Sequence, residues 1–381
     1  MATARSKFGT IRALPSRRFQ AVYMGPDGQR YKGPHTFDTE REARDWLDLQ
    51  RAQLTLGQWR SPNLGAVTLD AFAVDWLASR DDLKPKTQAG YADLLDRHIT
   101  PHLGRFQLST LTPVVVRQWY AKLGQTTGKT VRAQAYRLLH TVMAEAVRQG
   151  RADVNPCNIR GAGYVKATER QVLTPSEIET LAAQMPERWR FLIQAAAWTG
   201  LRFGEIVELR RQDVIMGTDQ NGDAVATFSV SRNAATVSGR FIVGTPKTHA
   251  GCRTVTLPPH LIPALQAHLD TFAALEPDAL VFPTVHGHRL TSSELSRLLK
   301  PAKDVIGCPA LHFHDLRHTA ATLAAQTGAT TKELMARLGH STPGAAMIYQ
   351  HAAQERDELL ARGLSQLAAL PGNVIPIRRV A

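Results

Sequence analysis

Two segments that contain proline and glycine divide this chain of 381 residues into three parts, and this division constrains the fold more than any other sequence feature. The segments are 60–65 and 155–163. Such breaker residues mark loops and linkers. The chain is also longer than one compact domain usually is. We therefore predict a multidomain protein with domains at 1–60, 67–160 and 170–370 and a basic tail at 371–381.

The first part is predicted to form a small β-sheet with one helix. Apolar residues alternate in two runs, 18–24 and 29–32, and the sequence Gly-Pro-Asp-Gly between them is a strong signal for a hairpin turn. Thr39 and Glu42 then have the spacing of a capping box. A helix is therefore expected to begin after Thr39.

The second part is predicted to be helical. Apolar residues recur at helical spacing over 69–79, 87–98, 112–123 and 130–149. The turn at 124–130 is similar to a phosphate-binding loop, but only three residues separate its glycines, whereas four are needed to surround a phosphate. We therefore expect a connection between helices there and no nucleotide site.

The third part mixes helices and strands. Residues 174–177 open one helix, and Gly200 can end the next in a left-handed conformation. A further helix is expected over 204–211. Stretches that alternate or are rich in branched residues predict strands at 224–231, 238–243 and 253–257. The chain is therefore predicted to be mainly α with small β-sheets, and its third part to be an α+β domain.

The charge of the chain favours a polyanionic partner. Its 46 Lys and Arg exceed its 33 Asp and Glu, which gives a net charge of +13. Most of the excess lies in the first two parts, because 11 basic residues stand against 6 acidic ones in 1–60, 13 against 8 in 61–165, and 22 against 19 in 166–381. Nucleic acid or an acidic membrane would suit this charge, and a solvated arginine-rich surface without a partner is the alternative.

The cysteines and the apolar runs favour a reducing, aqueous compartment. Cys157, Cys252 and Cys308 are far apart and odd in number, so neither a disulfide framework nor a metal knuckle is expected. The N-terminus lacks the apolar stretch of a signal sequence, and no apolar run is long enough to span a bilayer. We therefore predict a cytoplasmic protein without a membrane partner.

Two candidate functional groups lie in predicted turns of the third part. Arg202 follows Gly200 closely, and Glu205, three residues further on, could orient its guanidinium. Lys247 lies in the hairpin turn predicted between the last two strands. A structural ion pair and a solvated lysine are the simpler interpretations of these residues.

A cluster of histidines follows near the start of another predicted helix. His314 and Arg317 are three residues apart and therefore share a helix face, with His312 and His318 beside them. A metal site is the alternative interpretation, but no cysteine is near and Asp315 suits the first turn of a helix. The cluster is therefore not predicted to bind a metal.

The next predicted helix begins with a second capping box, formed by Thr330 and Glu333, and ends at Gly339. His340 emerges directly after it, and Tyr349 lies nearly two turns along the helix that follows. A tyrosine on a short helix most often packs half-buried, so Tyr349 alone indicates little.

Together these motifs resemble the tyrosine recombinase family, and within it the phage-type integrases. The similarity rests on order and spacing: Thr-Gly-Leu-Arg-Phe-Gly-Glu at 199–205, Lys247 in a turn, His-Asp-Leu-Arg-His at 314–318, Leu-Gly-His at 338–340 and Tyr349. It covers 170–365 closely. Residues 67–165 are similar to the family's helical core-binding domain and residues 1–60 to its arm-binding domain.

The resemblance implies that Arg202 and Arg317 hold the phosphate that is cleaved, with Glu205 supporting Arg202. Two arginines suit this task because each planar fork can bind phosphate oxygens bidentately and stays charged at any working pH. They would neutralise the charge that develops on the nonbridging oxygens in the transition state.

The resemblance gives the remaining chemistry to four further residues. His314 and His340 would donate hydrogen bonds to the same phosphate, and His314 would also accept the proton of the nucleophile. Tyr349 would attack the phosphorus and form a 3′-phosphotyrosyl link, while Lys247 would protonate the departing 5′ oxygen. Because this link conserves the phosphodiester energy, the implied reaction needs no cofactor, metal or ATP.

We therefore predict a site-specific DNA recombinase that integrates and excises a phage or another mobile element. The arm-binding domain favours an integrase over a recombinase that resolves DNA dimers, which is the nearest alternative. The same motifs leave open a topoisomerase with the same chemistry and a catalytically inactive DNA-binding regulator.

The resemblance also implies partners. Double-stranded DNA would bind at core and arm sites, and a homotetramer would assemble on it in the bacterial cytoplasm, at the nucleoid. A host DNA-bending protein and an excision factor would take part. The leucine-rich stretch 355–370 would dock either on a neighbouring subunit or within its own chain.

Overall fold

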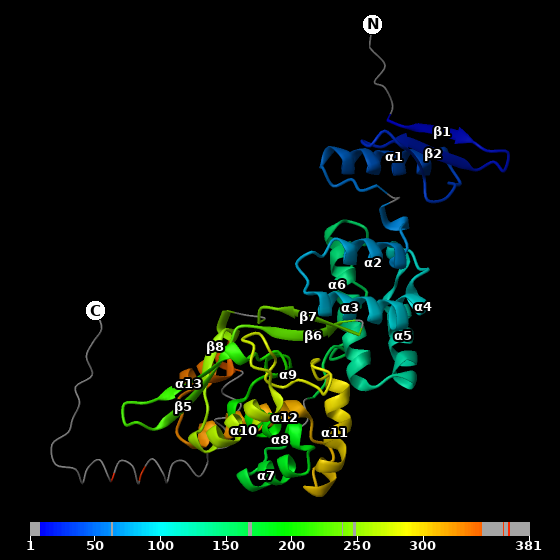
Figure 1. The fold of residues 1–381 in the computed structure, drawn as a ribbon. Helices are drawn as coiled ribbons and strands as arrows, with labels where there is room; N and C mark the ends of the chain where they lie inside the picture. Colours follow the sequence, from blue (N-terminus) through cyan, green and yellow to red (C-terminus); the bar gives the residue numbers. More distant parts are fainter. Residues whose placement is uncertain are drawn as a thin grey trace. The chain divides into compact units, whose positions relative to one another are not determined.

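The computed structural model describes residues 8–61, 64–166, 170–237, 239–246 and 249–344, together with residues 361 and 365. The chain forms two compact units, 1–167 and 168–381 (Figure 1). Within the first unit the buried apolar residues form two separate clusters, one in the N-terminal sheet and helix and one in the helical part.

The N-terminal part is a three-stranded antiparallel sheet with one helix against it. Its strands are β1 (Thr10–Ala13), β2 (Phe19–Met24) and β3 (Arg30–Lys32), in that order, and the helix is α1 (Glu40–Thr55). Aromatic and small side chains of β2 and β3, including Tyr23 and Tyr31, are buried against α1. The Thr39 capping box is present, and β1, which the sequence did not predict, exposes nearly all of its residues.

The second part of the first unit is helical, as predicted. Helix α6 contributes most to its core, where eight of its residues are buried. A short π-helix interrupts the second predicted helix. The elements are α2 (Leu69–Ala78), α3 (Pro85–Leu94), the π-helix Leu95–Ile99, α4 (Thr100–Leu103), α5 (Pro113–Thr126) and α6 (Lys129–Arg148), with 3-10 turns at Leu64–Ala66 and Leu108–Thr110.

The second unit is an α+β domain built around a buried helix, α8, which packs against α7, α10 and α12 (Figure 1). Short 3-10 turns connect several of the elements. The helices are α7 (Pro175–Ala183), α8 (Glu187–Thr199), α9 (Phe203–Ile206), α10 (Ile262–Phe272), α11 (Ser292–Val305), α12 (Phe313–Gln326) and α13 (Thr331–Leu338).

Two small antiparallel sheets accompany these helices. One has the order β4-β5-β8 and the other pairs β6 with β7. The strands are β4 (Val214–Thr218), β5 (Ala224–Val230), β6 (Asn233–Val237), β7 (Arg240–Gly244) and β8 (Arg253–Thr256). The sequence predicted β5, β7 and β8 but neither β4 nor β6, because β4 is almost wholly exposed and β6 buries only Ala234.

The helix predicted over 204–211 is much shorter than expected. After Ile206 the backbone leaves the helix and pairs with a distant segment, since the amide of Val281 donates to the carbonyl of Leu209. Glu208 turns inward there and accepts hydrogen bonds from Arg210 at 2.8 Å and Arg289 at 2.5 Å. Burial raises the pKa of Glu208, but these arginines outweigh it, so the pKa is lowered overall.

Within the described part of the chain, no helix combines the length and the apolar character needed to cross a membrane.

Candidate active site

Arg202 is positioned by the turn between α8 and α9. Helix α8 ends at Gly200 with a left-handed φ of 69°, as predicted. A Cβ at this glycine would lie 2.6 Å from Leu338 Cδ2, so the turn packs tightly against the end of α13. Two residues later, Arg202 occupies the N-cap of α9 in an extended conformation and exposes about a third of its side chain, 37%.

Glu205 lies one turn after Arg202 and holds it. Arg202 donates from Nη1 to Glu205 Oε1 at 2.7 Å and from its amide to Oε2 at 2.8 Å. Arg253, on β8, donates to both oxygens of the same carboxylate, at 3.2 and 3.0 Å. Burial alone would raise the pKa of Glu205, but the contacts with Arg253 and Arg202 lower it overall, so this buried carboxylate is charged at neutral pH.

Arg317 comes from α12 and is almost completely buried, with 4% of its surface exposed. It donates from Nη1 to the carbonyl of Gly200 at 2.6 Å and from Nη2 to the carbonyl of Leu338. The guanidinium therefore links the turn before Arg202 to the end of α13.

The end of α13 brings the two arginines together. Gly339 adopts a left-handed φ of 65° and ends the helix, as the sequence predicts. Its carbonyl accepts a hydrogen bond from Arg202 Nη2 at 3.1 Å, while the carbonyl of Leu338 accepts one from Arg317. Because these acceptors belong to consecutive residues and His340 follows directly, the structure brings Arg202, Arg317 and His340 to one place.

The histidines around these arginines have low pKa values. Loss of hydration is the largest cause at His314, and repulsion from His318 and Arg317 adds to it, so the pKa falls to about 4 although the side chain remains exposed. Loss of hydration, Arg317 and Arg202 likewise lower the pKa of His340 to about 4. Both rings are therefore neutral at pH 7, and each has a nitrogen that can accept a proton.

These shifts predict acid sensitivity of the free protein. A depressed pKa in the folded state means that the unfolded chain binds more protons, so stability is lost as pH falls from the ordinary value of 6.5 toward 4. We expect the midpoint of thermal unfolding to drop across this window, and His340→Gln to reduce the drop. Because His314 is exposed, the total loss of stability is smaller than two full pKa shifts would give.

Calorimetry or circular dichroism between pH 7.5 and 4.5 measures this drop. His286→Gln, at an exposed loop position, is the control and should follow the wild type. A His340→Gln variant with the same pH dependence as the wild type would contradict the assignment of the shift to His340.

Lys247 and Tyr349 lie outside the described residues, and so does all of the stretch 355–370 except residues 361 and 365. The sequence predicted a hairpin turn at Lys247, but the strands that flank it do not pair with each other. Strand β7 pairs with β6, and β8 pairs with β5 in the other sheet. Residues 343 and 344 are helical, at the predicted start of the helix on which Tyr349 was expected to lie nearly two turns along.

Two arginines of this region were not identified from the sequence. Arg253, whose side chain is only 5% exposed, holds Glu205, and Arg170 donates to Asp315 at 3.3 Å at the start of α12. Neither has a local pattern that marks it, because each contacts an acid that lies 48 or 145 residues away along the chain. Arg202 and Glu205, which were predicted, contact each other as their spacing suggested.

Comparison with known proteins identifies the family. The profile described as "Phage integrase family" matches residues 171–356, "Phage integrase, N-terminal domain" matches 7–56, and "Phage integrase, N-terminal SAM-like domain" matches 68–124. The chain is 39% identical to the integrase of Mycobacterium phage D29 over 380 residues, covering 97% of this chain and all of that one. The chain belongs to the phage integrase family.

Solved structures of integrases share the fold. The Tn1549 transposon integrase in complex with transposon right end DNA is 19% identical, with a TM-score of 0.65 over 77% of this chain and 99% of that chain. A lambda integrase dimer bound to a core site is 18% identical, with a TM-score of 0.56 over 99% and 100% of the two chains.

Membership in the family establishes the activity. This phage integrase is a tyrosine-type site-specific recombinase that mediates integration and excision. The predicted family, enzyme class and function are confirmed, and so is the predicted fold class, with a small β-sheet domain, a helical SAM-like domain and an α+β catalytic domain.

Proposed function

We propose that Arg202 and Arg317 bind the scissile DNA phosphate and stabilise the transition state of cleavage. The single observation that carries this proposal is that both guanidinium groups reach consecutive carbonyls, those of Gly339 and Leu338, directly before His340. Two fixed cations in one place can neutralise the charge that develops on nonbridging oxygens without a metal ion. Glu205 supports Arg202 by fixing the direction of its fork.

The proton transfers of the proposed reaction use the neighbouring groups. The Tyr349 oxygen attacks phosphorus as its proton passes to His314, and the bond from phosphorus to the 5′ oxygen breaks. Lys247 gives that oxygen a proton, and His340 donates a hydrogen bond to the phosphate. With its pKa lowered to about 4, His314 is neutral at pH 7, and a neutral imidazole has a ring nitrogen that can accept the proton. The reverse sequence on another strand joins the DNA.

Nicked core-site DNA, from which the cleaved fragment diffuses away, tests this mechanism. The full-length chain, incubated with this DNA in excess chelator and without nucleotide, is expected to give a protein–DNA band that survives denaturing electrophoresis. No band under these conditions, with binding intact, would contradict the proposal.

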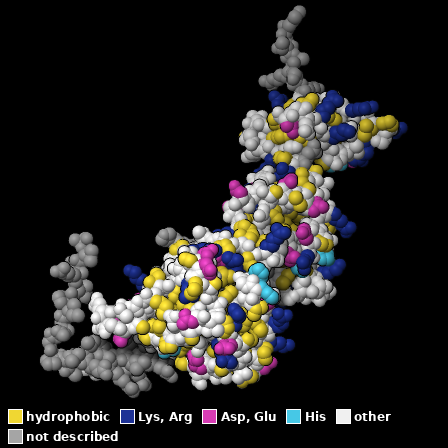
Figure 2. Space-filling view, viewed as in Figure 1, with side chains coloured by type: hydrophobic (Ala, Val, Ile, Leu, Met, Phe, Trp, Pro, Cys, Tyr) yellow, Lys and Arg dark blue, Asp and Glu magenta, His cyan; other side chains and the backbone are white. Residues whose placement is uncertain are grey.

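We propose that the N-terminal part binds arm-site DNA through the open face of its sheet. The strand register places Arg12, Arg30 and Lys32 on the face opposite α1, together with Gln20. All three cationic residues are exposed. Figure 2 shows Lys and Arg side chains gathered over this part of the molecule. A two- or three-stranded ribbon with such a face suits the DNA backbone and the major groove.

Deletion of residues 1–60 is therefore expected to abolish integration while leaving cleavage of an isolated core site. Recombination between complete attachment sites and cleavage of nicked core DNA are measured on the same protein preparation. The triple variant R12Q/R30Q/K32Q tests the same role without a deletion, because all three residues are exposed and their substitution should not affect folding. Undiminished integration by the truncated chain would remove the role of an arm-binding domain.

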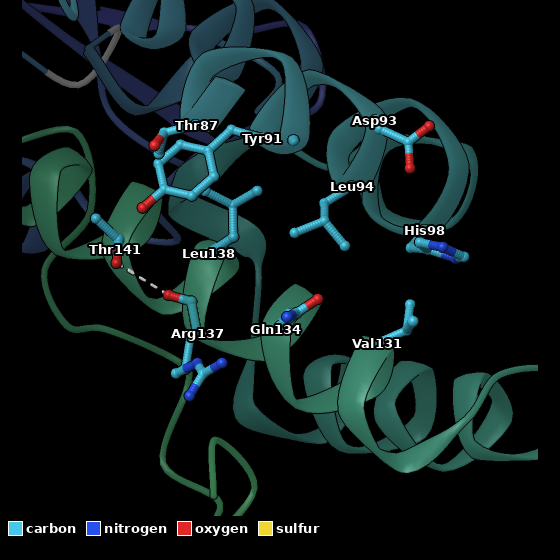
Figure 3. A pocket seen from close by; sticks show the side chains of 11 residues that line it. Thr87, Tyr91, Asp93, Leu94, His98, Val131, Gln134, Arg137, Leu138 and Thr141 are labelled. Carbon is cyan, nitrogen blue, oxygen red and sulfur yellow. Dashed lines mark hydrogen bonds between the residues drawn. The ribbon is translucent and has the colours of Figure 1, made fainter. Parts of the chain in front are cut away.

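We propose that a groove of the helical part contacts core-site DNA. The groove lies between α3 and α6, has a volume of about 620 Å³, and is lined by both polar and apolar side chains. Figure 3 shows Gln134, Arg137 and Thr141 on α6, with Thr87 and His98 among the residues of the opposite wall. Exposed amide, hydroxyl and guanidinium groups on one helix face are those that read bases and hold phosphates.

Arg137→Gln is expected to weaken core-site binding evenly across sequences and to reduce the slope of log Kd against log salt by about 1, as loss of one phosphate contact does. Binding by the full-length chain is measured by fluorescence anisotropy at several salt concentrations. Arg148→Gln is the matched control, because Arg148 lies on the same helix but outside the groove. Equal slopes for the two variants would contradict the proposed contact between Arg137 and a DNA phosphate.

We propose domain boundaries at 1–60, 67–160 and 170–370, a basic tail at 371–381, and a homotetramer on two DNA sites. Support for the assembly comes from related structures, which include a lambda integrase dimer bound to a core site and a lambda integrase tetramer bound to a Holliday junction. A host DNA-bending protein and an excision factor complete the proposal, with the complex at the nucleoid of the bacterial cytoplasm.

A further inference from the structure

Arg253 makes four side-chain hydrogen bonds in the catalytic domain, although it is not a member of the proposed catalytic set. It begins β8, and only 5% of its side chain is exposed. Its guanidinium donates to both oxygens of Glu205, from Nε to the carbonyl of Arg337 at 2.7 Å, and from Nη1 to the carbonyl of Gly251 at 3.1 Å. One side chain thus joins α9, the end of α13 and the turn before β8.

The contacts with Glu205 and with the Arg337 carbonyl lead to neighbours of the proposed phosphate site. Glu205 holds Arg202, and the carbonyl of Arg337 directly precedes those of Leu338 and Gly339, which accept from Arg317 and Arg202. The turn at Gly339 also lies against Arg253, because a Cβ there would be 3.1 Å from Arg253 Nη1.

The way in which Glu205 is shared determines how Arg202 binds it. A carboxylate and a guanidinium prefer a bidentate arrangement with two parallel hydrogen bonds. Arg253 donates to both carboxylate oxygens, and the side chain of Arg202 contacts Oε1 through Nη1 while Nη2 turns to the carbonyl of Gly339. Without Arg253, the full fork of Arg202 could rotate onto Glu205 and away from a phosphate.

We propose that Arg253 is a positioning residue for Arg202: by binding both oxygens of Glu205 and the Arg337 carbonyl, it keeps the Arg202 guanidinium directed at the scissile phosphate. This inference rests on the proposed function of Arg202. Lysine cannot replace Arg253, because one ammonium cannot span two carboxylate oxygens and two carbonyls in the same geometry.

The test compares two substrates in single-turnover formation of the covalent complex by the full-length chain. One is nicked core DNA with its normal phosphodiester, and the other carries a methylphosphonate at the scissile position, which lacks the negative charge of one nonbridging oxygen. On the phosphodiester, Arg253→Lys is expected to slow cleavage by about 10²-fold, the cost of a misplacement near 1 Å. Because the methylphosphonate carries less negative charge, its cleavage depends less on the Arg202 guanidinium.

The expected result is therefore that both Arg202→Ala and Arg253→Lys lose far less activity, relative to wild type, on the methylphosphonate than on the phosphodiester. A defect in folding would not depend on the substrate in this way. Arg289→Lys is the matched control, since Arg289 also pairs with a buried glutamate, Glu208, and should show the same small change on both substrates.

Two outcomes would overturn the inference alone: Arg253→Lys cleaving the phosphodiester as fast as wild type, or its defect persisting on the methylphosphonate while that of Arg202→Ala is relieved. Two other outcomes would contradict the proposed function, and the positioning role with it. Arg202→Ala could lose as much activity on the methylphosphonate as on the phosphodiester, or the wild type could form no covalent complex on the phosphodiester. Thermal unfolding of each variant shows whether the Arg253→Lys chain is folded at the assay temperature.

Discussion

Tyr349→Phe is expected to abolish the covalent protein–DNA complex and recombination, while leaving DNA binding close to that of the wild type. The substitution removes one oxygen atom, and that oxygen is the group proposed to form the bond to phosphorus. No other change in the proposed site accompanies it, since Arg202 and Arg317 are held by the turn at Gly200 and by the end of α13. The loss should therefore be complete within detection.

The measurement is denaturing electrophoresis after incubation with nicked core-site DNA, beside a binding assay on the same preparation. Tyr164→Phe is the matched control, because Tyr164 is a tyrosine with 74% of its surface exposed and has no proposed role. A covalent band of normal intensity from Tyr349→Phe would show that another side chain is the nucleophile.

Local features of the fold could be predicted from the sequence because their causes are local. The capping box at Thr39 depends on residues three apart, and so does the one at Thr330, whose side chain accepts from the amide of Glu333. The left-handed ends at Gly200 and Gly339 depend on a single residue type. These glycines also place Arg202 and His340 directly after their helices, so the motif positions could be predicted together with the fold.

Features that depend on distant contacts could not be predicted in this way. Strand β4 is held by pairing with β5 and not by a buried face of its own, so it has little apolar pattern. The chain leaves α9 early because Leu209 pairs with Val281, and Arg253 matters because Glu205 lies beside it. The roles of Lys247 and Tyr349 remain proposals that rest on the motif and the family.

Arg317→Lys is expected to slow covalent complex formation by about 10²- to 10³-fold, the usual cost of removing one preorganised donor from a charged transition state. Lysine keeps the positive charge but cannot form the planar fork that reaches the carbonyls of Gly200 and Leu338 together. Charge alone would then be insufficient, because the direction of the remaining N–H groups toward the phosphate depends on these two anchors.

A purely structural role for Arg317 predicts a different result. Because the side chain is buried at the junction of α8, α12 and α13, its loss also leaves two carbonyls without their donors, which costs about 1–3 kcal/mol each when they stay buried. Arg317→Ala should therefore destabilise the domain more than Arg317→Lys does, while both variants lose cleavage. Arg297→Lys, at an exposed position on α11, is the control. If the cleavage rate follows the fraction of folded protein in every variant, Arg317 contributes to stability alone. If the Arg317→Lys chain is folded but cleaves slowly, Arg317 acts on the phosphate.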